Sequence, residues 1–213
     1  ERVQAFFPGL NHRFRRRILH QREKWYGAHP SGAFGSEFEP SFGFAITVLD
    51  HARRCPCGQP GQLEACASAT ALKAIASERI RNGSTGTLAD AVNQGEPLTP
   101  ILIGNHAEQG DQLAMSLVME TADWLAIGIV TLMHTIDPSA IILGGAMTFG
   151  REEHPVGQAF LDRIDTSVRR RTFPTLAKKT ALRFATLGGN AGSIGAAGLS
   201  RLAWKQQHSH THA

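Results

Sequence analysis

The sequence predicts an α/β protein, and the clearest evidence lies in the last third of the chain. Two short apolar runs, at 140–143 and 182–187, have the length and composition of buried strands. Each run ends in a pair of glycines, at 144–145 and 188–189, and each pair precedes sequence of helical character. Strand, glycine turn and helix repeated in this order are typical of the α/β class.

The composition is that of a folded protein with one basic segment. The chain has 213 residues, of which 42% are hydrophobic, enough for one domain with a good core or a little more. The net charge of +4 is unevenly spread, because seven arginines and lysines lie within residues 1–24 against two glutamates. Runs of this kind are more often solvated than bound to nucleic acid, so the charge predicts no nucleic-acid partner.

The cysteines and the apolar runs indicate a cytoplasmic protein. All three cysteines fall between residues 55 and 66, which fits a reducing compartment and a local metal knuckle better than a disulfide framework. The longest apolar run, 124–133, is shorter than the about 20 residues that cross a bilayer, so no membrane partner is predicted. Residues 1–24 show no apolar signal-peptide core, and a start at Glu1 suggests a truncated or excised beginning.

Residues 1–43 are interpreted as an irregular basic segment rich in glycine and proline, with disorder or an aberrant reading frame as alternatives. A short helix over 11–25 is one option, since apolar side chains there would share a face. The β-branched run at 44–49 predicts a strand that leads to the cysteines. We therefore expect an α/β domain at 44–204 and a frayed tail at 205–213.

Helices are predicted where apolar residues recur at intervals of three and four between capping signals. The longest such stretch, 111–136, is a core helix that Pro138 ends. Thr99-Pro100 opens another helix, because proline is favoured at the first helical position. The expected helices cover residues 63–81, 88–93, 100–110, 111–136, 157–171 and 191–204.

The stretch from Cys55 to Ser68, C-P-C-G-Q-P-G-Q-L-E-A-C-A-S, is predicted to build a site instead of a core. The closely spaced thiols and the glycine-proline turn form a tight knuckle, and a helix begins near Leu63 with Glu64 in its first turn. Cys55 and Cys57 are candidate metal ligands, since thiolates bind zinc. A glutamate in a first helical turn is usually a partner of the helix dipole, and this alternative stays open for Glu64.

This stretch resembles the signature C-x-C-G-x-x-G-C-x-E of the ROK family of bacterial sugar kinases and repressors. The resemblance implies that Glu64 binds hydroxyls of a hexose, and that Cys55 and Cys57 belong to a structural zinc site. Gln62 stands where the family has its third cysteine, which implies a weakened or empty zinc site unless His51 and Cys66 complete it. The family's upstream Gly-Glu-x-Gly-His element has no counterpart here. The positions that match the signature are Cys55, Cys57, Gly58, Gly61 and Glu64.

Further strings between Arg53 and Leu202 resemble the C-terminal lobe of a ROK kinase, among them I-D-P-S-A-I-I-L-G-G and L-G-G-N-A-G-S-I-G-A-A-G-L. The resemblance implies an actin-like ATPase (ribonuclease H-like) α/β fold with the N-terminal lobe absent. It also implies ATP with Mg²⁺ as the cofactor, and a nucleotide cleft lined by Gly144 and Gly145. For the pair at 188–189, close helix–strand packing is the expected role.

The family takes its catalytic base from an Asn-Asp motif and its phosphate loop from an Asp-x-Gly-Gly-Thr motif, and neither string occurs here. We therefore assign no catalytic residue. The predicted function is a partial ROK sugar kinase of glycolysis, inactive alone, whose intact relative transfers the γ-phosphate of ATP to the 6-hydroxyl of glucose or a similar hexose. One alternative is a fragment of a sugar-sensing ROK repressor, which would contact DNA. Another is an interaction domain whose helix 111–136 packs in a homo-oligomer, since family members commonly form dimers or tetramers.

Overall fold

The computed structural model describes residues 4–6, 18–20, 23–25, 53–55 and 58–208 of the chain. The strands there are β1 (Gln4–Phe6), β2 (Ile18–His20), β3 (Glu23–Trp25), β4 (Ala140–Leu143) and β5 (Ala181–Phe184). The α-helices are α2 (Leu63–Ala67), α3 (Ala69–Arg81), α4 (Thr87–Asn93), α5 (Pro100–Glu108), α6 (Gln112–Ile136), α7 (Pro155–Arg171), α8 (Pro174–Lys179) and α9 (Ala191–His208). Two 3-10 helices are η1 (Arg151–Glu153) and η2 (Gly188–Asn190).

The main sheet is parallel and has the order β1-β4-β5. In its register Gln4 pairs with Ile141, and Leu143 pairs with Phe184. β2 and β3 form a separate antiparallel pair. Because β4 and β5 run in the same direction, the loops that follow them leave from the same edge of the sheet. Ligands of open parallel α/β sheets bind outside this carboxyl edge.

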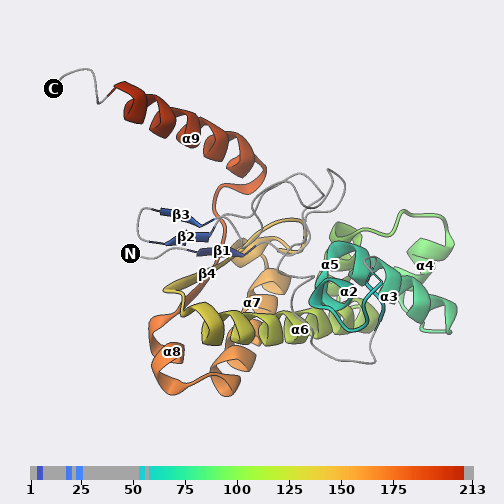
Figure 1. The fold of residues 1–213 in the computed structure, drawn as a ribbon. Coiled ribbons are helices and arrows are strands. Elements are labelled where there is room, and N and C mark those ends of the chain that lie inside the picture. The colour runs from blue at the N-terminus through green and yellow to red at the C-terminus, as the bar shows by residue number, and fades with distance from the viewer. Residues whose placement is uncertain (1–3, 7–17, 21–22, 26–52, 56–57, 209–213) are drawn as a thin grey trace.

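Helix α6 is the central element of the core. Asp111 caps its start, and Asp137 ends it in a left-handed conformation (φ 46°) directly before Pro138. Figure 1 shows α7 packed along α6 and α8 near the end of α6 that leads to β4, while α2, α3 and α5 also contact α6 and α4 contacts α5. Gln112–Thr135 has the length and apolar composition of a membrane-crossing helix, but 56% of its apolar 18-residue window is buried inside the protein. Packing in the core is therefore sufficient to explain its apolar character.

The sequence predicted one helix over 63–81, but the structure has two helices there. The prediction missed the break at Ser68. Ser68 adopts an extended backbone (φ −106°, ψ 164°) between α2 and α3. Its Oγ accepts a hydrogen bond of 3.0 Å from the amide of Ala71 and thereby caps α3. Serine competes for backbone hydrogen bonds in this way, which makes it a better cap than an interior residue.

Other elements agree with the sequence more closely. The helices expected at 88–93, 100–110, 111–136 and 157–171 are confirmed within a few residues as α4, α5, α6 and α7. The strand expected at 140–143 is β4, and the next strand is shorter than expected. Helix α8 was not predicted, and α9 continues past residue 204.

The N-terminal predictions have mixed outcomes. The optional helix over 11–25 is wrong, because β2 and β3 occupy 18–20 and 23–25. The strand expected at 44–49 lies outside the described residues. The division of the chain at residues 43 and 204 remains a prediction.

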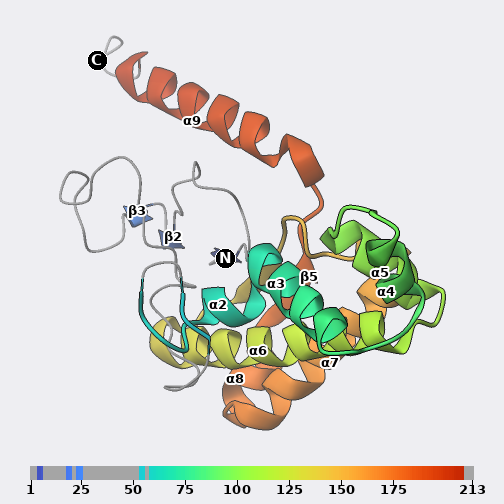
Figure 2. The ribbon, with the colours of Figure 1, turned by 90° about the vertical axis from the view of Figure 1, so that its right-hand side faces the viewer.

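Helix α9 leaves the rest of the structure. In Figures 1 and 2 it extends away from the core beyond η2. Its large apolar side chains are correspondingly exposed, and they include Ile194, Leu202 and Trp204.

Candidate functional site

The cysteine knuckle is a tight backbone turn that precedes α2. The Cys55 amide donates to the Gln59 carbonyl, and the Gly58 amide donates to the Cys55 carbonyl, both at 2.8 Å. Gly58 and Gly61 have φ values of 92° and 68°, a region that glycine enters at little steric cost. The side chain of Cys55 is buried, whereas Cys57 lies outside the described residues.

Helix α2 fixes the place of Glu64. Its neighbour Leu63 is only 2% exposed and lies against Gly128 of α6, where a Cβ would overlap the Leu63 methyl group. The glycine thus forms a notch that lets α2 approach α6 closely. Glu64, in the first turn of α2, is half-buried. The predicted sugar-binding carboxylate is therefore held by the core and not by a loop.

The donor groups that the structure describes around the knuckle do not complete a tetrahedral zinc site by themselves. Gln62, buried at the N-cap of α2, offers an amide oxygen where a thiolate is needed. Cys66 is buried in α2, and burial raises the pKa of its thiol above the usual value, against a smaller opposing effect of the Arg53 charge. Within 53–55 and 58–208, no group of three or more His, Cys, Asp or Glu side chains could hold a metal ion. His51 lies outside the described residues.

The second candidate place is the carboxyl edge of the sheet, far from α2 in sequence. Gly144 is buried directly after β4, and Gly145 is exposed with φ 95°. The amide of Ala185, just after β5, donates to the carbonyl of Leu143 at 2.7 Å, so the two strand ends lie side by side. The structure thus brings the predicted nucleotide glycines to the edge where parallel sheets bind ligands.

Gly188, the first glycine of the pair at 188–189, has a different role from the expected one. Gly188 has φ 53°, and a Cβ on it would meet no atom within 4 Å. Close packing at Gly188 was therefore the wrong explanation. The left-handed conformation of Gly188 itself, at the start of η2 between β5 and α9, is what favours glycine there.

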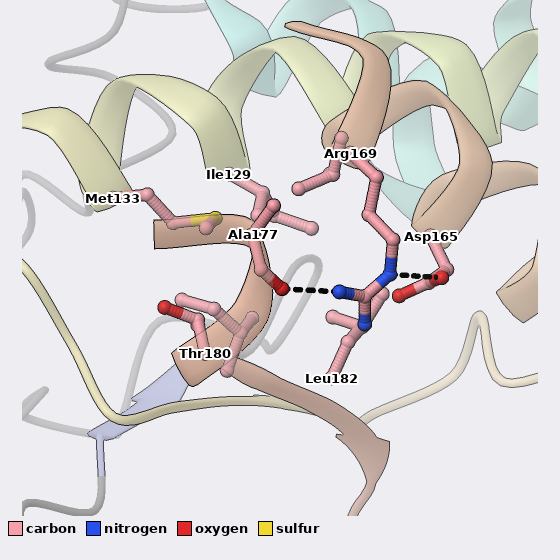
Figure 3. A pocket seen from close by; sticks show the side chains of 9 residues that line it. Ile129, Met133, Asp165, Arg169, Ala177, Thr180 and Leu182 are labelled. Carbon is pink, nitrogen blue, oxygen red and sulfur yellow. Dashed lines mark hydrogen bonds and ion pairs between the residues drawn. The ribbon is translucent and has the colours of Figure 1, made fainter. Parts of the chain in front are cut away.

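A small cavity between α6, α7, α8 and β5 is not a ligand site. Its volume is about 10 Å³, room for roughly one water molecule, whereas small-molecule sites span about 300–1,000 Å³. Figure 3 shows Arg169 beside it, donating to Asp165 at 2.6 Å and to the Ala177 carbonyl. The cavity is therefore a packing gap behind the sheet.

A model of the ROK family matches residues 28–202, most of the chain. The chain belongs to the ROK family. The match begins inside the segment 1–43 that the sequence suggested was irregular.

Several curated ROK relatives are glucokinases. Those of Halalkalibacterium halodurans and Streptomyces coelicolor are each 31% identical to this chain, over 151 and 175 residues. These alignments cover 70% and 80% of this chain but 44% and 52% of the relatives. A xylose repressor of Caldicellulosiruptor bescii is 27% identical over 119 residues, which is 56% of this chain and 28% of the repressor. The chain thus spans about half the length of the glucokinases it matches.

Solved ROK structures confirm the actin-like ATPase fold class. A ROK glucokinase from Streptomyces griseus, solved in complex with glucose and AMPPNP, superposes with a TM-score of 0.66 at 28% identity. This match covers 93% of the present chain and 60% of that one. A ROK transcriptional regulator, a homologue of the E. coli MLC protein, gives a TM-score of 0.65 at 22% identity, over 84% of this chain and 40% of that one.

Proposed function

We propose that this chain is the C-terminal lobe of a ROK sugar kinase of the glucokinase type. The proposal rests on the place that each of the two motif elements has in the fold. Glu64 lies on a helix locked against α6, and Gly144-Gly145 lies at the carboxyl edge of β4 and β5. The similarity to a glucokinase solved with glucose and AMPPNP supports the same reading.

In this proposal the two places have separate tasks. The carboxylate of Glu64 accepts hydrogen bonds from hydroxyls of glucose or a similar hexose and orients the ring. The backbone at Gly144 and Gly145 allows ATP, bound with Mg²⁺, to approach the sheet edge without a side chain in the way. The intact relative would transfer the γ-phosphate of ATP to the 6-hydroxyl of the sugar.

We propose further that the 213-residue chain does not catalyse this transfer by itself. Phosphoryl transfer to an alcohol needs a base that accepts the hydroxyl proton and a loop that holds the phosphates in line. The Asn-Asp and Asp-x-Gly-Gly-Thr strings that supply these groups in the family do not occur in the sequence. Loss of a general base alone costs about 10²–10⁴-fold in rate.

Titration calorimetry with glucose, followed by a coupled assay for glucose 6-phosphate, tests these statements. Glu64→Gln should lower glucose affinity about tenfold or more, since hydrogen bonds to charged groups contribute about 1.5–3 kcal/mol. Glu96→Gln, which changes an exposed glutamate after α4, is the matched control and should bind glucose as the parent chain does. Equal affinity of the Glu64→Gln variant and the parent chain would contradict the sugar-binding role. ATP-dependent formation of glucose 6-phosphate by the chain would overturn the proposed inactivity.

A sugar-sensing repressor is the second candidate, because a xylose repressor and a ROK transcriptional regulator are among the similar proteins. Such a protein would bind a sugar through the same lobe without phosphorylating it, and would contact DNA through a separate domain. A longer reading frame that contains this chain would decide between them: Asp-x-Gly-Gly-Thr followed by Asn-Asp indicates a kinase, and a winged helix indicates a repressor. For either candidate we propose a cytoplasmic location and a homo-oligomer.

A further inference from the structure

The loop between β4 and α7 holds three successive residues in the left-handed region. Phe149, Gly150 and Arg151 have φ values of 47°, 84° and 60°. Only glycine adopts this conformation at little cost, and other residues pay about 1–2 kcal/mol each. Non-glycine residues persist in such conformations where the surrounding structure imposes them, and these places cluster at ligand-binding sites.

Two contacts impose the conformation. The buried ring of Phe149 packs edge-to-face on Phe160 of α7, with 4.9 Å between the ring centroids. The backbone of Arg151 lies so close to Gly157 of α7 that a Cβ there would overlap it. Gln158 adds a hydrogen bond of 2.8 Å from its Nε2 to the Glu152 carbonyl. The loop is thus clamped to α7 and keeps one shape.

The clamped loop places the guanidinium of Arg151 at the carboxyl edge of the sheet. Its Nη1 donates to the carbonyl of Ala185, just after β5, at 3.4 Å. Its Nε lies 3.7 Å from a carboxylate oxygen of Glu153, a side chain that is 73% exposed. Among the described residues, no other acceptor binds this guanidinium, whose side chain is 36% exposed. This guanidinium therefore has N–H donors without a protein acceptor among the described residues, and it lies at the end of β5, which is hydrogen-bonded to the end of β4 that leads into Gly144-Gly145.

We infer that Arg151 binds a phosphate group of the nucleotide; this inference rests on the proposed function of the Gly144-Gly145 turn. A guanidinium presents a planar set of N–H donors that matches phosphate oxygens and stays charged at all physiological pH values. The position outside the carboxyl ends of two parallel strands is where ligands bind in open sheets of this class. The unfavourable free energy of the left-handed residues has a compensating benefit in this proposal. Because the loop is already rigid, the arginine loses little conformational entropy when the nucleotide binds.

The inference is tested by calorimetry of the full chain with AMPPNP and Mg²⁺, and separately with adenosine. Arg151→Asn removes the guanidinium but suits the left-handed backbone, since asparagine enters this region more readily than most residues. We expect its melting temperature to equal or exceed that of the parent chain and its AMPPNP affinity to fall about tenfold or more. Adenosine affinity should not change. Arg151→Lys should keep part of the AMPPNP affinity, and Arg170→Asn, at an exposed arginine near the end of α7, should keep all of it.

The outcomes separate this inference from the proposal on which it rests. If the parent chain binds AMPPNP and Arg151→Asn binds it equally well, Arg151 is not a phosphate ligand, although the nucleotide site stands. If the variant loses AMPPNP and adenosine in parallel, Arg151 only shapes the loop, and the inference is wrong. If the parent chain binds neither compound, the nucleotide role of Gly144-Gly145 fails, and the inference fails with it. Glu153→Gln should raise AMPPNP affinity, because it removes a negative charge from beside the guanidinium.

Discussion

The carboxylate of Asp111 accepts a hydrogen bond of 2.9 Å from the backbone amide of Leu88, a residue of a different helix. Its other oxygen accepts a 2.8 Å bond from the amide of Ala114 and so caps α6. The hydroxyl of Thr87 adds a third bond at 3.1 Å. Gly86, the residue before α4, lies so close to this carboxylate that a Cβ would overlap it. One buried side chain therefore joins the starts of α4 and α6.

Asp111→Ala should lower the free energy of unfolding by about 2–3 kcal/mol. The substitution removes an N-cap, worth about 1 kcal/mol, and leaves the buried amide of Leu88 without an acceptor, which costs about 1–3 kcal/mol. Urea denaturation followed by circular dichroism measures this loss. Asp90→Ala, at an exposed aspartate of α4, is the control and should change stability by less than about 0.5 kcal/mol. If Asp111→Ala and Asp90→Ala lower the free energy of unfolding by similar amounts, the hydrogen bonds of Asp111 do not stabilise the fold as proposed.

The contribution of Asp111 should depend on pH. Burial alone would raise its pKa, but the hydrogen bonds from Ala114, Leu88 and Thr87 outweigh burial and hold the pKa below its usual value. A folded-state pKa below the unfolded value of about 3.9 stabilises the protein above that pH, and the stabilisation is lost as the pH falls through the folded-state value. The stability difference between the parent chain and Asp111→Asn should therefore be constant from pH 7 to about 5 and shrink below about 4. If the stability difference between the two proteins grew as the pH fell, the pKa of Asp111 would not be lowered in the folded state.

Gly128→Ala should destabilise the protein and weaken sugar binding together. Alanine is normally favoured over glycine in a helix by about 1 kcal/mol, but here its Cβ would push Leu63 and with it the helix that carries Glu64. We expect a net loss of about 1 kcal/mol and a lower affinity for glucose in calorimetry. Gly198→Ala, in the exposed helix α9 with no atom near the added Cβ, is the matched control and should gain up to about 1 kcal/mol. If both substitutions raise the free energy of unfolding, α2 does not pack against Gly128 as the structure shows.

The purified chain should contain well under one zinc per molecule, and Gln62→Cys should raise this content. The substitution supplies the thiolate that the knuckle lacks at this position, next to Cys55 and Cys57. Gln62→Ser keeps a residue suited to the N-cap but adds no soft ligand, so its zinc content should stay low. Elemental analysis after gel filtration gives the stoichiometry. One tightly held zinc in the parent chain would contradict the expectation.

Local signals in the sequence were sufficient for the elements that they determine. Thr99-Pro100 marks the start of α5, and the apolar spacing of 111–136 marks α6, because caps and periodicity act within a few residues. Ser68 lies in a run that continues on both sides with helical spacing, so its role as a cap is visible only once α2 and α3 are seen to diverge. Elements of three to six residues, such as β2 and α8, are too short for a period to show.

For the candidate sites, motifs in the sequence predicted Glu64 and Gly144-Gly145, whereas no motif pointed to Arg151, the phosphate ligand that we propose. Its conformation is imposed by a contact with Gly157 on the next helix, and no local pattern reports such a contact. The only available signal was a charged residue shortly after the glycine pair, which is common on protein surfaces. The notch at Gly128 was missed for the same reason, since its partner lies on α2.

The clamp on Phe149–Gly150–Arg151 has a consequence for how this loop tolerates changes in length. Connections between secondary structures usually accept inserted residues with little penalty. Here one extra residue would move the ring of Phe149 out of register with Phe160 and rotate the arginine away from the strand ends. Among homologues that share this turn, insertions and deletions should therefore be more frequent in the Gly83–Gly86 connection than between Gly145 and Gly157.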